Sequence, residues 1–192
     1  MIRVCSAAAL AVLTLVSAFA PAFAQERPSA VAAPAVRRTT LVVENLEKSM
    51  DFYQRLGMTK WYDKPTTRDQ PEGVVGAEDL PLTEDPREGR IVIMRGNNDR
   101  IGMIGLLGYD HPPLASARSN LMGIGTGDMI FMIEVGDIQG VYTRLQQAGT
   151  RFHRTPYKYK VVNPDNSVHT GTRMFAYDPD GHLIEIAQPD SK

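Results

Sequence analysis

An internal repeat constrains this chain more than any other feature. The β-branched run at 40–43 is followed by apolar residues at helical spacing that end at Gly57. The same order of strand, helix and glycine returns from residue 130. The matching positions lie 92 residues apart and are Val43 and Val135, Asn45 and Asp137, Gly57 and Gly149. Because Asn and Asp favour helix N-caps and Gly favours the position after a helix, this ungapped match predicts a duplicated module.

Strand-like segments follow each predicted helix. They are 59–62, 90–94 and 101–107 in the first half, and 150–157, 171–177 and 183–187 in the second. The last two are joined by Asp178-Pro179-Asp180-Gly181, whose Pro and Gly suit a hairpin turn. Each half therefore reads as βαβββ, with modules at 37–107 and 128–189 and a linker at 108–127. The irregular stretch Asp63 to Gly89 is a candidate lid or, equally, a surface insertion.

The N-terminal residues have the pattern of an export signal. Arg3 precedes an apolar run from Ala7 to Ala20, and the small residues of Ala22-Phe23-Ala24 offer a cleavage point before Gln25. We therefore expect a signal peptide at 1–24, a flexible Pro- and Ala-rich lead-in at 25–36, and a periplasmic or secreted protein. An uncleaved anchor is the alternative, which Pro21 disfavours. The only cysteine, Cys5, lies inside the predicted signal, so we expect no disulfide or thiol chemistry in the mature chain.

Charge and the remaining motifs exclude several classes of function. With 21 basic and 22 acidic side chains and no basic block, the chain has no electrostatic signature for nucleic acid. No later segment approaches the roughly 20 apolar residues of a spanning helix, so we expect no membrane partner after cleavage. The glycine clusters lack the context of a phosphate loop, and no nucleophile elbow occurs.

Two motifs carry a family resemblance. They are Val43-Glu44-Asn45-Leu46 running into Phe52-Tyr53 and Leu56-Gly57, and Asp178-Pro179-Asp180-Gly181-His182-Leu183-Ile184-Glu185. With them the chain resembles the vicinal-oxygen-chelate superfamily (glyoxalases, bleomycin resistance proteins and extradiol dioxygenases) over about 37–189. The resemblance implies an α+β fold in which two βαβββ modules form a curled mixed sheet around a cup, with the helices outside. It also implies a small-molecule ligand and makes a homodimer plausible.

Strand alternation supports a cup independently of the resemblance. In the strands at 130–135 and 183–187, one face is large and apolar, as packing on a helix requires, while the other face is mixed. If Asp178 pairs with His182 across the turn, Phe175, Arg173 and His169 share the mixed face with Glu185. We expect the mixed faces to line the cavity.

The resemblance also implies where metal ligands would lie, namely on the first and last strands of each module. Those positions hold Arg38 and Gly105 in the first module, and Ile130 and Glu185 in the second. Only Glu185 is a ligand type, whereas a catalytic zinc or iron usually has about three protein ligands. We therefore expect Arg38 to occupy the vacated site and pair with Glu185, with no metal as cofactor. A divalent cation held by Glu185 with help from His169 remains the alternative.

The other candidate residues are ligand-binding ones. Arg38 and Glu185 are the expected catalytic pair, and Arg173 would present donors to an anionic or carbonyl-bearing ligand. Glu134 could supply acid–base chemistry beside Glu185 or simply form a salt bridge. Met132 and Phe175 are the apolar candidates. His169 follows a turn cluster, so an exposed loop is the more economical interpretation for it.

Three functions stay open from the sequence. The first is an exported protein that binds or transforms a small organic molecule in the cup without a typical metal site. The second is a metal-dependent lyase, isomerase or dioxygenase of glyoxalase type that uses Glu185. The third is a sequestering protein of bleomycin-resistance type, in which ligand fit alone matters. Substrate identity cannot be read from the strands, because specificity lies in loops.

Overall fold

The computed structural model describes residues 35–67, 80, 82–116 and 124–190. Residues from Ala35 to Lys192 form a compact unit. The predicted signal at 1–24 and nearly all of the lead-in at 25–36 lie outside the described residues. Within the part that the structure describes, no helix is both long and apolar enough to cross a membrane.

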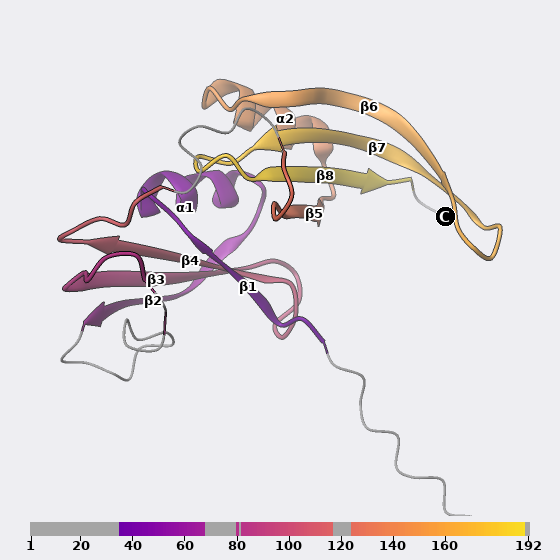
Figure 1. Ribbon diagram of the computed structural model, residues 1–192. Coiled ribbons are helices and arrows are strands. Elements are labelled where there is room, and N and C mark those ends of the chain that lie inside the picture. Colours follow the sequence, from indigo (N-terminus) through magenta and orange to yellow (C-terminus); the bar gives the residue numbers. More distant parts are fainter. Residues whose placement is uncertain (1–34, 68–79, 81, 117–123, 191–192) are drawn as a thin grey trace, which may run out of the picture. The chain divides into compact units, whose positions relative to one another are not determined.

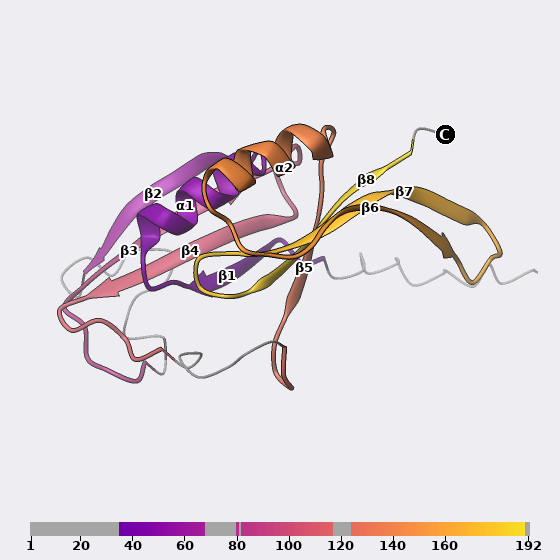
Figure 2. The same cartoon turned by 90° about the horizontal axis from the view of Figure 1, so that it is seen from above.

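The described elements repeat one βαβββ order. The first module contains β1 (Arg38–Val42), α1 (Leu46–Arg55), β2 (Thr59–Thr67), β3 (Glu88–Arg95) and β4 (Met103–Asp110). The second contains β5 (Ile130–Glu134), α2 (Ile138–Gln147), β6 (Phe152–Val162), β7 (Val168–Tyr177) and β8 (Leu183–Pro189). Figures 1 and 2 show these elements, with β6 and β7 forming the longest hairpin. The predicted α+β class and its two modules are confirmed.

Both sheets have the same strand order. The first is β1-β4-β3-β2 and the second is β5-β8-β7-β6, each with one parallel and two antiparallel pairings. The duplication extends to individual backbone hydrogen bonds. Val43 N donates to Leu107 O at 2.9 Å, and Val135 N donates to Ala187 O at 2.9 Å. The ladders of the described strands therefore form two sheets of four strands, not one continuous ladder.

The two helices begin and end in the same way. Asn45 accepts a bond from Lys48 N through its side chain, and Asp137 does the same for Gly140 N. Gly57 and Gly149 have positive φ values of 99° and 73°, which glycine adopts without steric cost. Around each glycine the two bonds of a Schellman motif form, for example Gly149 N to Gln146 O at 3.0 Å. The predicted caps are therefore confirmed.

Three strands extend into regions for which the sequence analysis predicted no regular structure. β2 continues to Thr67 and β3 starts at Glu88, so both ends of the candidate lid at 63–89 belong to the sheet. Residues 68–79 and 81 lie outside the described residues. β4 ends at Asp110, so the first residues of the predicted linker at 108–127 are strand, and 117–123 again lie outside the described part.

The main core lies between the helices and one face of each sheet. Leu41, Phe52 and Leu106 from the first module pack in the same cluster as Leu145 and Ile184 from the second. We call the opposite face of each sheet its helix-distal face. In the first sheet that face is also apolar, where Ile91, Ile93, Met103, Leu107 and Tyr109 pack together with Leu80, Leu82 and Leu114.

The turn between β7 and β8 joins the two modules. Asp180 accepts bonds from Glu44 N at 2.7 Å and from the Ser49 hydroxyl at 2.9 Å. Asp178, only 5% exposed, accepts from the Tyr53 hydroxyl at 3.0 Å and from two backbone amides of its own turn. Burial and the adjacent Asp178 carboxylate raise the pKa of Tyr53.

His182, at the exit of this turn, lies 3.1 Å from the Asp178 carboxylate through Nδ1 and is mostly buried. Its backbone N–H is one of the two amides that donate to Asp178. The Asp-Pro-Asp-Gly-His motif is therefore a structural junction between modules.

Candidate functional site

The helix-distal face of the second sheet carries most of the predicted site. Asp178 N donates to His182 O at 3.0 Å, which is the pairing across the turn that the prediction from strand alternation assumed. The register then places Phe175 opposite Glu185 and Arg173 opposite Ala187, with Met132 beside Glu185 on the parallel neighbour β5. Arg173, Phe175, Glu185 and Met132 therefore share one face, as predicted.

Arg173 is the centre of this face. Its Nε donates to the Tyr157 hydroxyl at 2.7 Å, and its Nη1 lies 3.2 Å from Glu185 Oε1. The Arg173 side chain is 30% exposed and that of Glu185 is 20% exposed. Burial opposes the charge of Arg173, but the bonds to Tyr157 and Glu185 outweigh it and raise the pKa of the guanidinium.

Aromatic rings surround the Arg173 guanidinium. Its Cζ lies 5.3, 5.2 and 5.7 Å from the ring centroids of Tyr157, Tyr159 and Phe175. The guanidinium of Arg154 also stacks on the Tyr157 ring, with its Cζ 3.5 Å from the ring centroid. The result is a fixed cation with π-faces around it, a surface that suits flat or anionic groups.

The expected pair of Arg38 with Glu185 is wrong. No hydrogen bond or ion pair joins these two side chains among the described residues, and the partner of Glu185 is Arg173. The reason is the topology. Arg38 belongs to β1 of the first sheet, whereas Arg173 lies one strand from Glu185 within the second sheet.

Arg38 instead lies over Gly105 on the helix-distal face of the first sheet. A Cβ added at Gly105 would come 3.2 Å from Arg38 Cδ and 2.8 Å from Thr40 Oγ1. The stem of Arg38 therefore fills the space that a larger side chain at position 105 would need.

Arg38 also lines a cavity of about 390 Å³ between β1 and β5. The apolar lining includes Met58, Ile101, Met103, Phe131 and Met132, and Glu134 adds a carboxylate. Within the described part of the chain, the Arg38 guanidinium has no hydrogen-bonded or ionic partner. Three predicted site residues, Arg38, Met132 and Glu134, are thus brought together in one pocket of ligand-binding size.

His169 is placed differently from the preferred expectation. It is a half-buried strand residue of β7, opposite Val161, not part of an exposed loop. It lies near the end of the β6–β7 hairpin. His169 is therefore in β7, which begins before the predicted strand at 171–177, and it lies away from Glu185.

The described residues do not fit a protein-held metal ion. They contain no group of three or more His, Cys, Asp or Glu side chains positioned to hold one. Of the positions that bind metal in the family, the space beside Gly105 is filled by the side chains of Thr40 and Arg38, and the Glu185 carboxylate is paired with Arg173. A guanidinium at this carboxylate opposes a divalent cation on charge grounds.

Sequence reasoning missed Tyr157 and Tyr159. They alternate along β6 and face Arg173 and Gly171 in the register. A Cβ at Gly171 would meet Tyr159 Cε1 at 2.8 Å and Gln188 O at 2.5 Å, so the glycine lets the ring lie flat against the strand. The Tyr-Lys-Tyr spacing was the available signal, because residues two apart on a strand share a face.

Comparisons with known proteins agree with this fold. The family model of the Glyoxalase/Bleomycin resistance protein/Dioxygenase superfamily matches residues 35–186. A search of the curated proteins found no match.

Three solved structures illustrate the likeness. A glyoxalase family protein from Bacillus cereus is 19% identical with a TM-score of 0.54, covering 88% of this chain and 100% of its own. The trypanothione-dependent glyoxalase I of Leishmania major is 16% identical, with a TM-score of 0.49 and coverages of 81% and 87%. TnmS3, an antibiotic binding protein from Streptomyces sp. CB03234, is 18% identical, with a TM-score of 0.47 and coverages of 83% and 98%.

Proposed function

Since the chain belongs to the glyoxalase, bleomycin resistance protein and dioxygenase superfamily, we propose that it binds a small organic anion or carbonyl compound beside Arg38, without a protein-held metal ion. The observation that carries the proposal is a guanidinium with no hydrogen-bonded or ionic partner among the described residues, in a pocket that has apolar walls beside Glu134, Thr39, Asn97 and Asn98. A cation left without a partner beside apolar walls selects an anionic head joined to an apolar body.

Two features support binding as the primary role. The pocket of about 390 Å³ has the size of small-molecule sites, and its methionines adapt to ligand shape. Glu185 lies on the strand beside Met132, outside the pocket lining, and its carboxylate is paired with Arg173, so it is not a free base.

A titration with phenylglyoxylate and benzyl alcohol tests the proposal, because the first carries both a carboxylate and a ketone and the second has neither. We expect phenylglyoxylate to bind and Arg38→Gln to weaken it by about tenfold, the value of one charge-assisted bond. Arg38→Lys should recover part of the loss. Arg37→Gln is the matched control, because Arg37 is the exposed neighbour on the opposite strand face. Equal binding by Arg38→Gln and the control would refute the proposal.

The metal-dependent alternative makes a different prediction. Stoichiometric transition metal in purified protein, lost on Glu185→Gln, would establish a metal site and remove the basis for our assignment. We expect phenylglyoxylate affinity to be unchanged by chelator. Turnover abolished by Glu185→Gln, with binding retained, would assign a catalytic role to Glu185 beside the binding pocket.

Export is part of the proposal. The support for it is the sequence pattern of residues 1–24. Expression of the full chain in a Gram-negative host, followed by mass spectrometry of the periplasmic fraction, should give a protein that begins at Gln25. Recovery of uncleaved chain from the cytoplasm or the membrane would contradict it.

A further inference from the structure

We infer that the ligand of the Arg38 pocket is a zwitterion, with a carboxylate that bonds to Arg38 and an ammonium group that bonds to Glu134. The inference rests on the proposed function and names the chemical class of its ligand. Among the described residues that line this pocket, the charged ones are Arg38 and Glu134, which have opposite signs. A ligand in the pocket therefore meets one positive and one negative group.

Both charged side chains lie on the helix-distal side of their sheets. Arg38 is at the start of β1 and lies with Thr40 over Gly105. Glu134 is at the end of β5, where it pairs with Ala187, and Ala187 pairs in turn with Arg173. Because paired residues of a sheet share a face, Glu134 lies on the same face as Arg173. The two charges thus reach the pocket from the same side of the fold, one from each edge strand.

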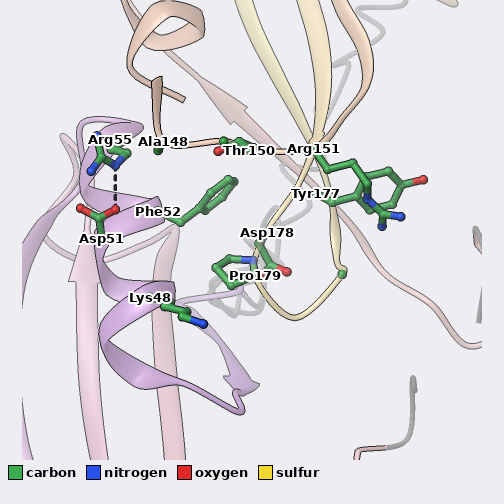
Figure 3. A pocket seen from close by; sticks show the side chains of 12 residues that line it. Lys48, Asp51, Phe52, Arg55, Ala148, Thr150, Arg151, Tyr177, Asp178 and Pro179 are labelled. Carbon is green, nitrogen blue, oxygen red and sulfur yellow. Dashed lines mark hydrogen bonds and ion pairs between the residues drawn. The ribbon is translucent and has the colours of Figure 1, made fainter. Parts of the chain in front are cut away.

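Neither charge of the pocket is neutralised by the protein. Beside α1, for comparison, Asp51 and Arg55 form a direct pair at 2.7 Å (Figure 3). No such bond joins Arg38 to Glu134, and neither side chain has another hydrogen-bonded or ionic partner within the described ranges. Both groups are therefore available to a ligand.

A simple anion would satisfy only one of these groups. Its carboxylate would bond to Arg38 but would share the pocket with the Glu134 carboxylate, and like charges repel. An ammonium group on the same ligand turns this repulsion into attraction, which is how a site separates a zwitterion from an anion. Met58, Phe131 and Met132 offer apolar surface for the rest of the ligand. The chemistry is that of an amino acid or another amino carboxylate.

Two matched pairs of ligands test the inference by calorimetric titration of the full chain. Phenylglycine differs from phenylacetate by an ammonium group beside the carboxylate, and para-aminomethylbenzoate differs from para-methylbenzoate by one at the far end of the ring. We expect at least one amine to bind about fivefold more tightly than its matched acid. The gain is moderate because Glu134 is exposed, and water screens its charge.

Variants of Glu134 assign this gain to one side chain. Glu134→Gln should abolish the difference within the pair without weakening the acid, and Glu134→Lys should reverse the preference. Glu88→Gln is the matched control, because Glu88 is also an exposed glutamate at the end of a strand but lies outside the pocket lining. Unfolding midpoints of these variants should match the parent, because both residues are exposed.

The inference and the proposed function fail in different ways. Equal affinities within both pairs, or a gain that survives Glu134→Gln, would overturn the zwitterion while phenylglyoxylate still binds through Arg38. Binding of phenylglyoxylate that does not depend on Arg38 would instead remove the proposed function. The comparison within each pair on the parent protein needs no variant, so the inference stays testable if a substitution disturbs folding.

Discussion

The two modules agree on the side that packs against helices and differ on the other side. Both helices have an Asn or Asp N-cap and a glycine-centred C-terminal motif with the same bonds. On the helix-distal faces, the first module places Thr40 and Arg38 around Gly105, whereas the second places Arg173 and Tyr157 around Glu185. Packing against the helices constrains the first side in both copies. On the other side the first sheet carries a second apolar cluster, whereas the second sheet carries the Arg173 group, so this side has diverged.

The turns before the last strands differ as well. Asp178 is buried at the junction of the modules. In the corresponding turn of the first module Asn98 is exposed, and among the described residues its side chain accepts bonds from Arg100 N and Ile101 N of its own turn. One copy of the turn has thus become the contact between modules, while the other stays a local turn.

The largest difference in stability should be between substitutions in the two turns before the last strands. Asp178→Ala leaves the buried Tyr53 hydroxyl and two amides without an acceptor, and should lower the free energy of unfolding by about 3–4 kcal/mol. Asn98→Ala should cost at most about 1 kcal/mol, because water can reach the amides it frees. Urea unfolding of both variants measures the contrast, and equal costs would refute the junction role.

The two close-packed glycines should rank next. Gly171→Ala should destabilise by about 3 kcal/mol, because its new methyl meets the backbone carbonyl of Gln188, which cannot turn aside. Gly105→Ala should cost about 1–2 kcal/mol, because Thr40 and Arg38 are side chains that can move. Adding Thr40→Ala should reduce the second cost and leave the first unchanged, as thermal or urea unfolding can show.

The helix caps should give equal effects in both modules. Asn45→Ala and Asp137→Ala each remove one acceptor from the first turn of a helix and should cost about 1 kcal/mol. Urea unfolding of the two single variants measures the costs. A difference well above 0.5 kcal/mol, about the additivity error of such measurements, would mean that the copies are not equivalent on their packed sides.

The smallest effect should appear at acid pH. Arg90 donates two bonds of 2.7 Å to Asp63, and these bonds lower the pKa of Asp63 below its usual value. Because the folded pKa is depressed, this stabilisation is present above the unfolded pKa of about 3.9 and disappears as the pH falls toward the folded pKa.

Asp63→Asn should therefore cost about 1 kcal/mol at pH 7 and less than half of that near pH 2, as urea unfolding at the two pH values measures. Asp190→Asn is the control in the second module, because the Asp190 pair with Lys158 is longer and exposed. A cost for Asp63→Asn that does not change with pH would contradict the assignment.

Much of the fold could be predicted from the sequence. The caps at Asn45 and Asp137, the glycines at 57 and 149 and the alternation along β5 and β8 are local patterns, and each one was confirmed. The alternation of side chains along the strands also placed Arg173, Phe175 and Glu185 on one face, because the register of a hairpin follows from its turn. The strand ends at Thr67 and Asp110 were missed, since ladder pairing between distant segments decides where a strand stops.

The sequence by itself determined the duplicated βαβββ order, the caps and the face on which each strand residue lies, because these depend on contacts between residues close along the chain. Only the tertiary structure decided which partner each charge has. From the sequence we expected Arg38 to pair with Glu185, but the partner is Arg173, because strand order puts it one strand away. The same long-range packing left Arg38 beside the pocket between β1 and β5, without a partner among the described residues.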